Sequence, residues 1–372
     1  MVVYTEQSVA ALRLTVRRLL EGESDVPTTT PEVDETAYLA AVERHRLVVF
    51  LALREEQLDL TPELARRIHA LARRERIATL GMARALHQAT DALTAAGVRV
   101  LSFKGLALAA QAHGDFAARG SGDLDLFVHP ADVVFACHAL EKAGWRADSA
   151  YASPGLTWAW SHTLRNYYEM PLHSSTSTID LHWHLGPTRH LLPSFDEAWA
   201  QRAAVRVGGA DVATLGAPDA LRHSASHAAK DDWSVLRSLV DVCLLRDQVL
   251  PNELARGPRS VSTTLEIVSA QLGRSCFRPR GRRAAALAVA RQAMPLDASV
   301  GRFPGHRTLL AARRLGRDAT SLGDLKRVIA VTLAHPSDLG SLNASRLPGA
   351  SIRVAGIRAR AARRRLREWR HA

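Results

Sequence analysis

Residues 98–128 read VRVLSFKGLALAAQAHGDFAARGSGDLDLFV, and the succession of patterns in this stretch decides the fold class. The β-branched, apolar run from Val98 to Phe103 is typical of a strand. Lys104-Gly105 ends that run, and the alanine- and leucine-rich segment from Gly105 to about Ala112 predicts a short helix. A polar, glycine-rich loop then leads into DLDLFV (residues 123–128), a second strand that ends before Pro130. The stretch therefore predicts a small α/β unit.

The segments on either side of this stretch are mostly helical in pattern. Apolar residues at helical spacing predict helices at Glu6–Glu21, at Thr36–Glu55, and from Thr61-Pro62 to about Ala95. On the C-terminal side we expect a helix at 131–143, a strand at 178–185, a β-hairpin turning at Gly208-Gly209, and helices after Pro218. The sequence thus predicts an α+β fold with a small mixed β-sheet core at 97–216. Helical regions flank this core at 1–96 and, with a basic tail, at 217–372.

Arginine dominates the charge of the chain. Of its 372 residues 47% are hydrophobic, so the chain can bury a core and is long enough for two domains. The net charge of +12 is concentrated in arginine clusters at 274–283 and 358–370. Such clusters favour phosphate-bearing partners, including a polyanion contacted by the tail, although a solvated helix face also explains them.

The chain shows none of the common signs of secretion or membrane insertion. The first twenty residues carry charges within their apolar run, unlike a signal peptide. No uncharged apolar stretch approaches the roughly 18 residues of a membrane span. The three cysteines are widely spaced, which argues against a disulfide framework or a zinc ribbon. We therefore expect a cytoplasmic protein.

Two carboxylates in the second strand are the strongest candidates for chemistry. Asp123 and Asp125 are separated by one residue, so in a strand both side chains point to the same face. Two neighbouring carboxylates repel each other, and a bound cation is the usual reason for such a pair. Mg²⁺ binds one or two carboxylates together with phosphate oxygens. The pair therefore predicts a metal site for a phosphate-bearing ligand.

Residues before and after this pair suit phosphate binding. Gly105 stands at a strand–helix turn, where phosphate can approach backbone N–H groups, and Lys104 adds a positive charge beside it. Arg119 and Ser121 lie in the loop just before the pair and are further phosphate-binding candidates. Asp180, in the later strand TIDLHW, is a third carboxylate, and three carboxylates can hold two metal ions.

This order resembles the polymerase-beta nucleotidyltransferase superfamily, whose pattern is a glycine turn, then h-D-h-D-h, and then h-D-h, with h an apolar residue. It is more closely similar to a bacterial family of uncharacterised nucleotidyltransferases. That family carries a KG turn, an R-x-x-x-D-I-D-L-L-V segment, an I-D-L-H-W strand and a helical H-G-A-K-H-x-W-x-x-L stretch followed by D. The resemblance covers roughly residues 45–247, and the matching residues are Lys104, Gly105, Arg119, Asp123, Asp125, Val128, residues 179–183 (IDLHW), His227, Lys230, Trp233, Leu236 and Asp241. Two positions depart from the patterns: Leu106 follows the turn where the superfamily has glycine or serine, and Asp231 replaces the second histidine of the family.

The resemblance implies a metal-dependent nucleotidyltransferase, with residues 97–216 as its nucleotidyltransferase core. Such an enzyme moves an NMP group from an NTP to an acceptor, which the sequence leaves open as a small molecule, peptide, protein or RNA. Asp123 and Asp125 are then expected to bind Mg²⁺ (or Mn²⁺), and Asp180 to complete a second metal site or to act as a base. Second-tier candidates for the site are His182, His227, Lys230 and Asp241.

Two other functions remain open from the sequence. Asp180, His182 and His184 alternate along one predicted strand, and His223 and His227 share a helix face. Together they predict, as an alternative, a zinc- or iron-dependent hydrolase. The second alternative is a non-catalytic nucleic-acid-binding protein with a degenerate nucleotidyltransferase core, because the arginine clusters suit a polyanion.

Overall fold

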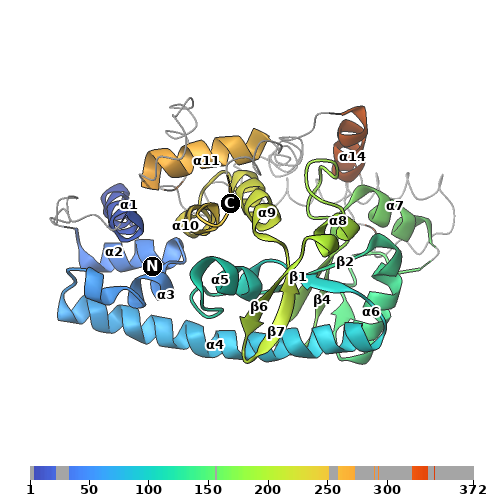
Figure 1. Ribbon diagram of the computed structural model, residues 1–372, viewed down its shortest axis with the longest axis horizontal. Coiled ribbons are helices and arrows are strands. Elements are labelled where there is room, and N and C mark those ends of the chain that lie inside the picture. The colour runs from blue at the N-terminus through green and yellow to red at the C-terminus, as the bar shows by residue number, and fades with distance from the viewer. Residues whose placement is uncertain are drawn as a thin grey trace, which may run out of the picture. The chain divides into compact units, whose positions relative to one another are not determined.

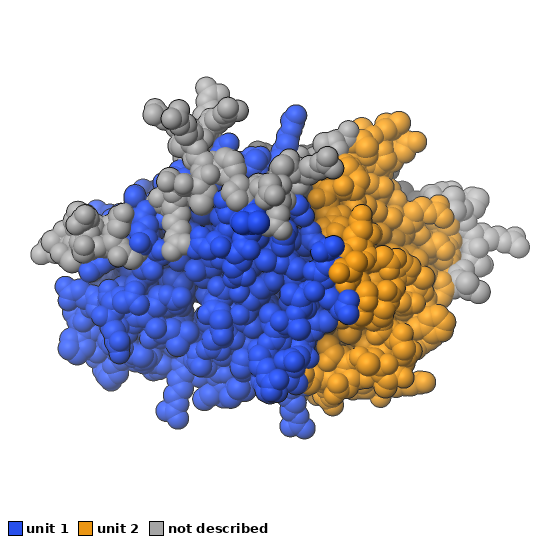
Figure 2. Space-filling model, in the orientation of Figure 1, with its two compact units in different colours: residues 1–86, 102–124, 201–294 blue, residues 87–101, 125–200, 295–372 orange. Residues whose placement is uncertain are grey.

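The computed structural model describes residues 4–21, 33–155, 157–250, 259–272, 289, 292, 321–333 and 339. These residues form a mixed α+β fold, as the sequence predicts (Figure 1). The chain divides into two compact units (Figure 2). Unit 1 comprises residues 1–86, 102–124 and 201–294, and unit 2 comprises residues 87–101, 125–200 and 295–372. The three-part division of the sequence stays a prediction, and both arginine clusters lie outside the described residues.

Helices fill the N-terminal part of the chain. Helix α1 (Glu6–Glu21) matches its predicted bounds and buries Val9, Leu12 and Val16. The helical pattern predicted at Thr36–Glu55 is divided in the structure into α2 (Glu35–Arg44), α3 (Val48–Ala52) and the 3₁₀ turn η1 (Glu55–Gln57). Arg46 adopts a positive φ of 56° and ends α2, while the buried His45 beside it accepts a hydrogen bond from the Leu236 backbone N–H at 3.3 Å. That tertiary contact requires a turn where the pattern of the sequence continues as a helix.

The central sheet follows a strand order that the sequence does not specify. Among the described residues its strands are β1 (Val100–Ser102), β2 (Leu124–Val128), β3 (Arg146–Ala147), β4 (Glu169–His173) and β5 (Thr178–His182). They are arranged in the order β1-β2-β5-β4-β3, and β5, β4 and β3 are antiparallel neighbours. Strands β1, β2 and β5 are shorter than predicted, and every residue of β1 and β2 is buried. The order places β5 directly beside β2 although β3 and β4 lie between them in sequence.

Each unit has helices of its own. In unit 2 the elements are η2 (Pro130–Asp132), α6 (Val133–Lys142), α7 (Trp158–Asn166), α8 (Phe195–Ala200) and α14 (Leu322–Leu333), with α14 packed against α7. Unit 1 contains α5 (Gly105–His113), the hairpin β6 (Ala203–Val207) and β7 (Ala210–Thr214), α9 (Ala217–Lys230), α10 (Leu236–Arg246) and α11 (Arg259–Leu272). The hairpin turns at Gly208-Gly209, as predicted. Helix α10 packs against α5, α9 and α11.

One helix, α4 (Pro62–Ala95), runs for 34 residues without a break (Figure 1). In the part of the chain that the structure describes, none of the helices combines the length and the apolar character needed to cross a membrane.

Candidate metal and nucleotide site

Side chains from two neighbouring strands of unit 2 form a group suited to a metal ion. Asp125 lies on β2, and Asp180 and His182 lie two residues apart on β5, so their side chains share a face of that strand. One potential ligand atom from each of the three lies within 4.8 Å of the others. Asp125 and His182 are buried, whereas Asp180 is half-buried. The group therefore combines two carboxylates with an imidazole at the edge of the core.

His182 lies between two carboxylates. Its Nε2 is 3.0 Å from Asp125 Oδ1 and 3.3 Å from Glu169 Oε2. Glu169 is placed there by the antiparallel β4–β5 ladder, whose register sets it directly opposite His182. The sequence does not indicate Glu169 as a site residue, because the strand β4 that carries it was not predicted. If β4 is recognised as a strand paired with β5, the register of that pair identifies Glu169 as the neighbour of His182.

Two buried or half-buried tyrosines lie beside these carboxylates. The Tyr168 ring stacks on the His182 ring with centroids 6.2 Å apart. Burial first, and then the charge of Glu169, raise the pKa of Tyr168 well above its ordinary value. Burial, followed by the charges of Glu169 and Asp180, likewise raises the pKa of Tyr151. Carboxylates that disfavour a phenolate anion also favour a cation at the same place.

Asp123 is placed differently from Asp125. Strand β2 begins at Leu124, so Asp123 lies one residue before it, is exposed, and belongs to unit 1. Among the described residues the three-membered metal-ligand group contains Asp125 and not Asp123. The expectation that Asp123 and Asp125 share a strand face therefore does not follow from the observed strand bounds, and a metal role for Asp123 stays a prediction.

The predicted phosphate turn is built around Gly105 in unit 1. Gly105 is the first residue of α5 and has a φ of +49°, a conformation that favours glycine. A Cβ at this position would lie 2.6 Å from Ser121 Oγ and 3.4 Å from the Asp123 carbonyl oxygen. Ser121 donates its hydroxyl hydrogen to that carbonyl at 2.8 Å. The missing side chain thus allows the loop before β2 to lie against the start of α5, while Lys104 occupies the N-cap position.

Arg119 is held by a buried carboxylate, also in unit 1. Asp241 on α10 lies 3.1 Å from Arg119 Nη2 and 2.9 Å from His113 Nε2, and it is almost fully buried. Arg119 Nη1 also donates to the Gly105 carbonyl at 3.3 Å, and Arg237 donates to the Gly120 carbonyl at 2.6 Å. These contacts fasten the loop and the glycine turn to α10. Phosphate binding by Arg119 stays a prediction, since its guanidinium already has partners inside the protein.

Charged neighbours oppose the effect of burial on the pKa of Asp241. Burial alone would raise its pKa, but Arg119, the hydrogen bond from His113 and the charge of Arg237 more than offset this, so the pKa of Asp241 is lowered. Burial, followed by the charge of Arg119, lowers the pKa of Arg237 to about 9. The cluster is therefore an ion network built around the buried carboxylate of Asp241.

A comparison with protein families finds a match over residues 31–254 to the family described as uncharacterised nucleotidyltransferase. The chain belongs to this nucleotidyltransferase family. A comparison with curated proteins found no match. The matched region contains the Asp125–Asp180–His182 group, Glu169, the Gly105 turn and the Asp241 network.

Further candidate residues lie on α9 in unit 1. His223 is buried and packs edge-on against Phe103, with ring centroids 4.9 Å apart. His227 Nδ1 lies 3.5 Å from Asp231, and Lys230 is the last residue of α9. Within the described residues the metal-ligand group includes neither of these histidines nor His184. The alternative set of zinc or iron ligands is therefore not assembled as one group.

Proposed function

We propose that this nucleotidyltransferase moves an NMP group from an NTP to an acceptor, using a divalent metal ion held in part by Asp125 and Asp180. The observation that carries the proposal is the Asp125–Asp180–His182 group within a chain that belongs to a nucleotidyltransferase family. In the reaction an acceptor oxygen attacks the α-phosphorus, the bond from that phosphorus to the bridging α–β oxygen breaks, and pyrophosphate leaves. The acceptor loses its proton to a base.

The donor set fits a hard divalent cation. Carboxylate oxygens suit Mg²⁺ and Mn²⁺, and imidazole is accepted more readily by Mn²⁺ than by Mg²⁺. The charges of Glu169 and Asp180, which add to the effect of burial in raising the pKa of Tyr151, also support a cation at this place. When bound, the ion would neutralise charge on the triphosphate oxygens.

Each residue of the group has a distinct task in the proposal. Asp125 and Asp123 supply oxygens toward the metal from the start of β2. His182 orients Asp125 through their 3.0 Å contact. Asp180 serves as a further metal ligand or as the base that takes the acceptor proton, and Glu169 adds negative charge on the other side of His182.

Phosphate contacts are proposed for Lys104, the backbone at Gly105 and Ser121, and Arg119 holds their loop in place. His227 and Lys230 are second-tier candidates for acceptor binding, and the arginine-rich tail for contact with a polyanionic acceptor.

The direct test is transfer from α-labelled NTPs, combined with calorimetric titration of Mg-NTP. We expect Asp125→Asn to weaken Mg-NTP binding at least tenfold and to abolish transfer. Asp180→Ala is expected to retain most of the nucleotide affinity and lose turnover, because a base or second metal ligand acts mainly in the transition state.

Asp196→Asn provides the control, because Asp196 is an exposed carboxylate of unit 2 that pairs with Arg99. It should bind and transfer like wild type. Wild-type Mg-NTP affinity in Asp125→Asn contradicts the proposal. Stoichiometric zinc or iron in the purified protein would instead favour the hydrolase alternative.

A further inference from the structure

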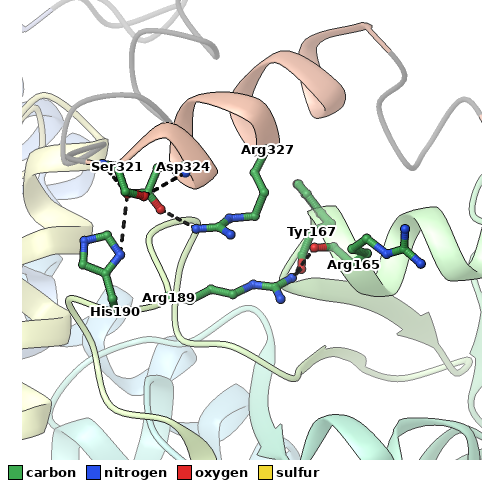
Figure 3. Close-up of polar contacts among 7 residues, drawn as sticks. All are labelled: Arg165, Tyr167, Arg189, His190, Ser321, Asp324 and Arg327. Carbon is green, nitrogen blue, oxygen red and sulfur yellow. Dashed lines mark hydrogen bonds and ion pairs between the residues drawn. The ribbon is translucent and has the colours of Figure 1, made fainter.

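Three basic side chains gather in unit 2 near the end of β5. His184 follows His182 by two residues, so at most about 7 Å of backbone separates them. Arg189 lies in the loop after β5, and Arg327 lies on α14 (Figure 3). All three are half-buried, which leaves them within reach of a ligand. His184, Arg189 and Arg327 are here called the basic cluster.

Arg189 uses only one edge of its guanidinium within the described protein. Its Nη2 donates to the carbonyl oxygens of Leu164 at 3.2 Å and Tyr167 at 3.4 Å, and also to that of Arg165 (Figure 3). These carbonyls lie at the C-terminal end of α7. Among the described residues no carboxylate forms an ion pair with Arg189, and its Nε and Nη1 make no hydrogen bond. A guanidinium with a free edge and no counter-charge can bind an anion in two-pronged fashion.

Among the described residues, the carboxylate that pairs with the basic cluster is that of Asp324. Asp324 is buried and accepts hydrogen bonds from the Ser321 backbone N–H at 3.1 Å and from the Ser321 hydroxyl at 2.8 Å. It also pairs with Arg327 and lies 3.5 Å from His190 Nδ1 (Figure 3). Asp324 therefore balances Arg327 and leaves the charge of Arg189 uncompensated by any described neighbour.

The electrostatics of the basic cluster agree with this imbalance. Burial, and then the charge of Arg327, lower the pKa of Arg189 to about 10. The charges of Arg189 and Arg327 both act on the imidazole of His184, which carries a ring N–H that can donate to an anion. Within the described residues its ring has no hydrogen-bond partner.

We propose that His184, Arg189 and Arg327 form a subsite for an anionic group, a phosphate or a carboxylate, of a molecule bound beside the Asp125–Asp180–His182 group. A phosphate or carboxylate there would pair with the free edge of Arg189 and accept the His184 N–H. That this anion belongs to a substrate of nucleotidyl transfer rests on the proposed function, whereas the affinity of the basic cluster for an anion does not.

The experiment is calorimetric titration of inorganic phosphate into the full chain with EDTA present, so that no metal contributes. We expect wild type to bind phosphate, and both Arg327→Gln and Arg189→Gln to weaken binding at least tenfold. His184→Gln, which removes no contact seen among the described residues, should weaken it about threefold. Thermal melts check folding, because Arg189→Gln also removes donors from the end of α7.

Arg165→Gln is the matched control. Arg165 is exposed, contributes only its carbonyl to Arg189, and its side chain extends away from Arg327 in Figure 3. It should bind phosphate like wild type. The proposal is overturned if wild type binds no phosphate, or if folded Arg327→Gln and His184→Gln bind it unchanged.

A second titration, with Mg-ATP, identifies the source of the anion. If Arg327→Gln weakens Mg-ATP binding as much as phosphate binding, the subsite holds a phosphate of the nucleotide. If Mg-ATP binds as in wild type while phosphate binding is lost, the anion belongs to the acceptor. Failure of transfer from NTPs would refute the proposed function without touching the phosphate result.

Discussion

At Gly105 the backbone has a φ of +49°, and a Cβ placed there would lie 2.6 Å from Ser121 Oγ. We expect Gly105→Ala to lower the free energy of unfolding by about 2 kcal/mol, because both the positive φ and the contact cost energy. It should also weaken Mg-NTP binding, since the loop carrying Ser121 must shift. Urea unfolding and calorimetric titration check the two effects.

The double variant Gly105→Ala/Ser121→Ala separates the two causes. Removing the Ser121 hydroxyl relieves the contact and leaves the backbone strain, so part of the lost stability should return. A Gly105→Ala protein as stable as wild type would show that the turn differs from the one described.

Asp241 is the second residue whose replacement gives a clear outcome. Asp241→Asn removes the buried carboxylate that pairs with Arg119, and we expect the free energy of unfolding to fall by about 3 kcal/mol at pH 7. Because the pKa of Asp241 is lowered in the folded protein, its stabilising effect is complete above about pH 4 and disappears as pH falls through the lowered value. The difference in the free energy of unfolding between wild type and Asp241→Asn should therefore become smaller in acid. Urea unfolding at pH 7, 5 and 3 will measure it.

Asp211→Asn serves as the comparison, because the Asp211–Arg206 pair is exposed and contributes little. Equal losses of stability in Asp241→Asn and Asp211→Asn would mean that Asp241 contributes no more to stability than an exposed carboxylate does. A difference in stability between wild type and Asp241→Asn that stays constant down to pH 3 would refute the lowered pKa of Asp241 as the source of stabilisation.

Among the elements, α4 allows the simplest test. Gly81 lies exposed in the middle of this 34-residue helix, and a Cβ there would meet nothing within 4 Å. Gly81→Ala should raise the free energy of unfolding by about 1 kcal/mol, since alanine loses less backbone entropy in a helix than glycine does. Thermal and urea unfolding measure the gain, and a loss of stability would mean that Gly81 is packed or not helical.

The turn between α9 and α10 indicates a structural role for Trp233. Asp232 and Trp233 both have φ values of +54°, an uncommon conformation for residues other than glycine. Trp233 is buried, its Nε1 donates to Thr264 Oγ1 at 2.9 Å, and its backbone N–H donates to the Ala228 carbonyl at 2.8 Å. The contacts of Trp233 therefore hold the strained turn that joins α9 to α10.

For the whole molecule, a buried neutral histidine sets a pH dependence. Burial, with smaller effects of Arg44 and Arg13, lowers the pKa of His45 to about 3. The unfolded chain binds a proton at His45 below about pH 6.5, and the folded chain does not until about pH 3, so stability falls as pH falls through this window. The slope approaches about 1.4 kcal/mol per pH unit for one such group. His184, whose pKa is lowered in the same way, adds to it.

Unfolding between pH 7 and pH 5 isolates this effect, because most carboxylates titrate at lower pH. His45→Gln should flatten the slope while losing some stability at pH 7, since the ring accepts the Leu236 N–H. An unchanged slope in this variant would exclude His45 as the source.

Local patterns in the sequence are enough to predict several features of the fold and the site. The strand–turn–helix at Lys104-Gly105, the strand after it and the Gly208-Gly209 hairpin depend on residues adjacent in sequence, through glycine conformation and apolar spacing. Family membership follows from the same short motifs. Alternation along β5 likewise predicts that Asp180 and His182 share a face.

Only the tertiary structure decides which side chains meet. Strand β5 lies beside β2, which brings His182 to Asp125 across 57 residues, and the β4–β5 register sets Glu169 opposite His182. The packing of α10 against α5 buries Asp241 beside Arg119, which the sequence alone predicts as a phosphate-binding residue. Strand order, register and burial arise from contacts between segments that are distant in sequence. One local sequence pattern is compatible with many such arrangements.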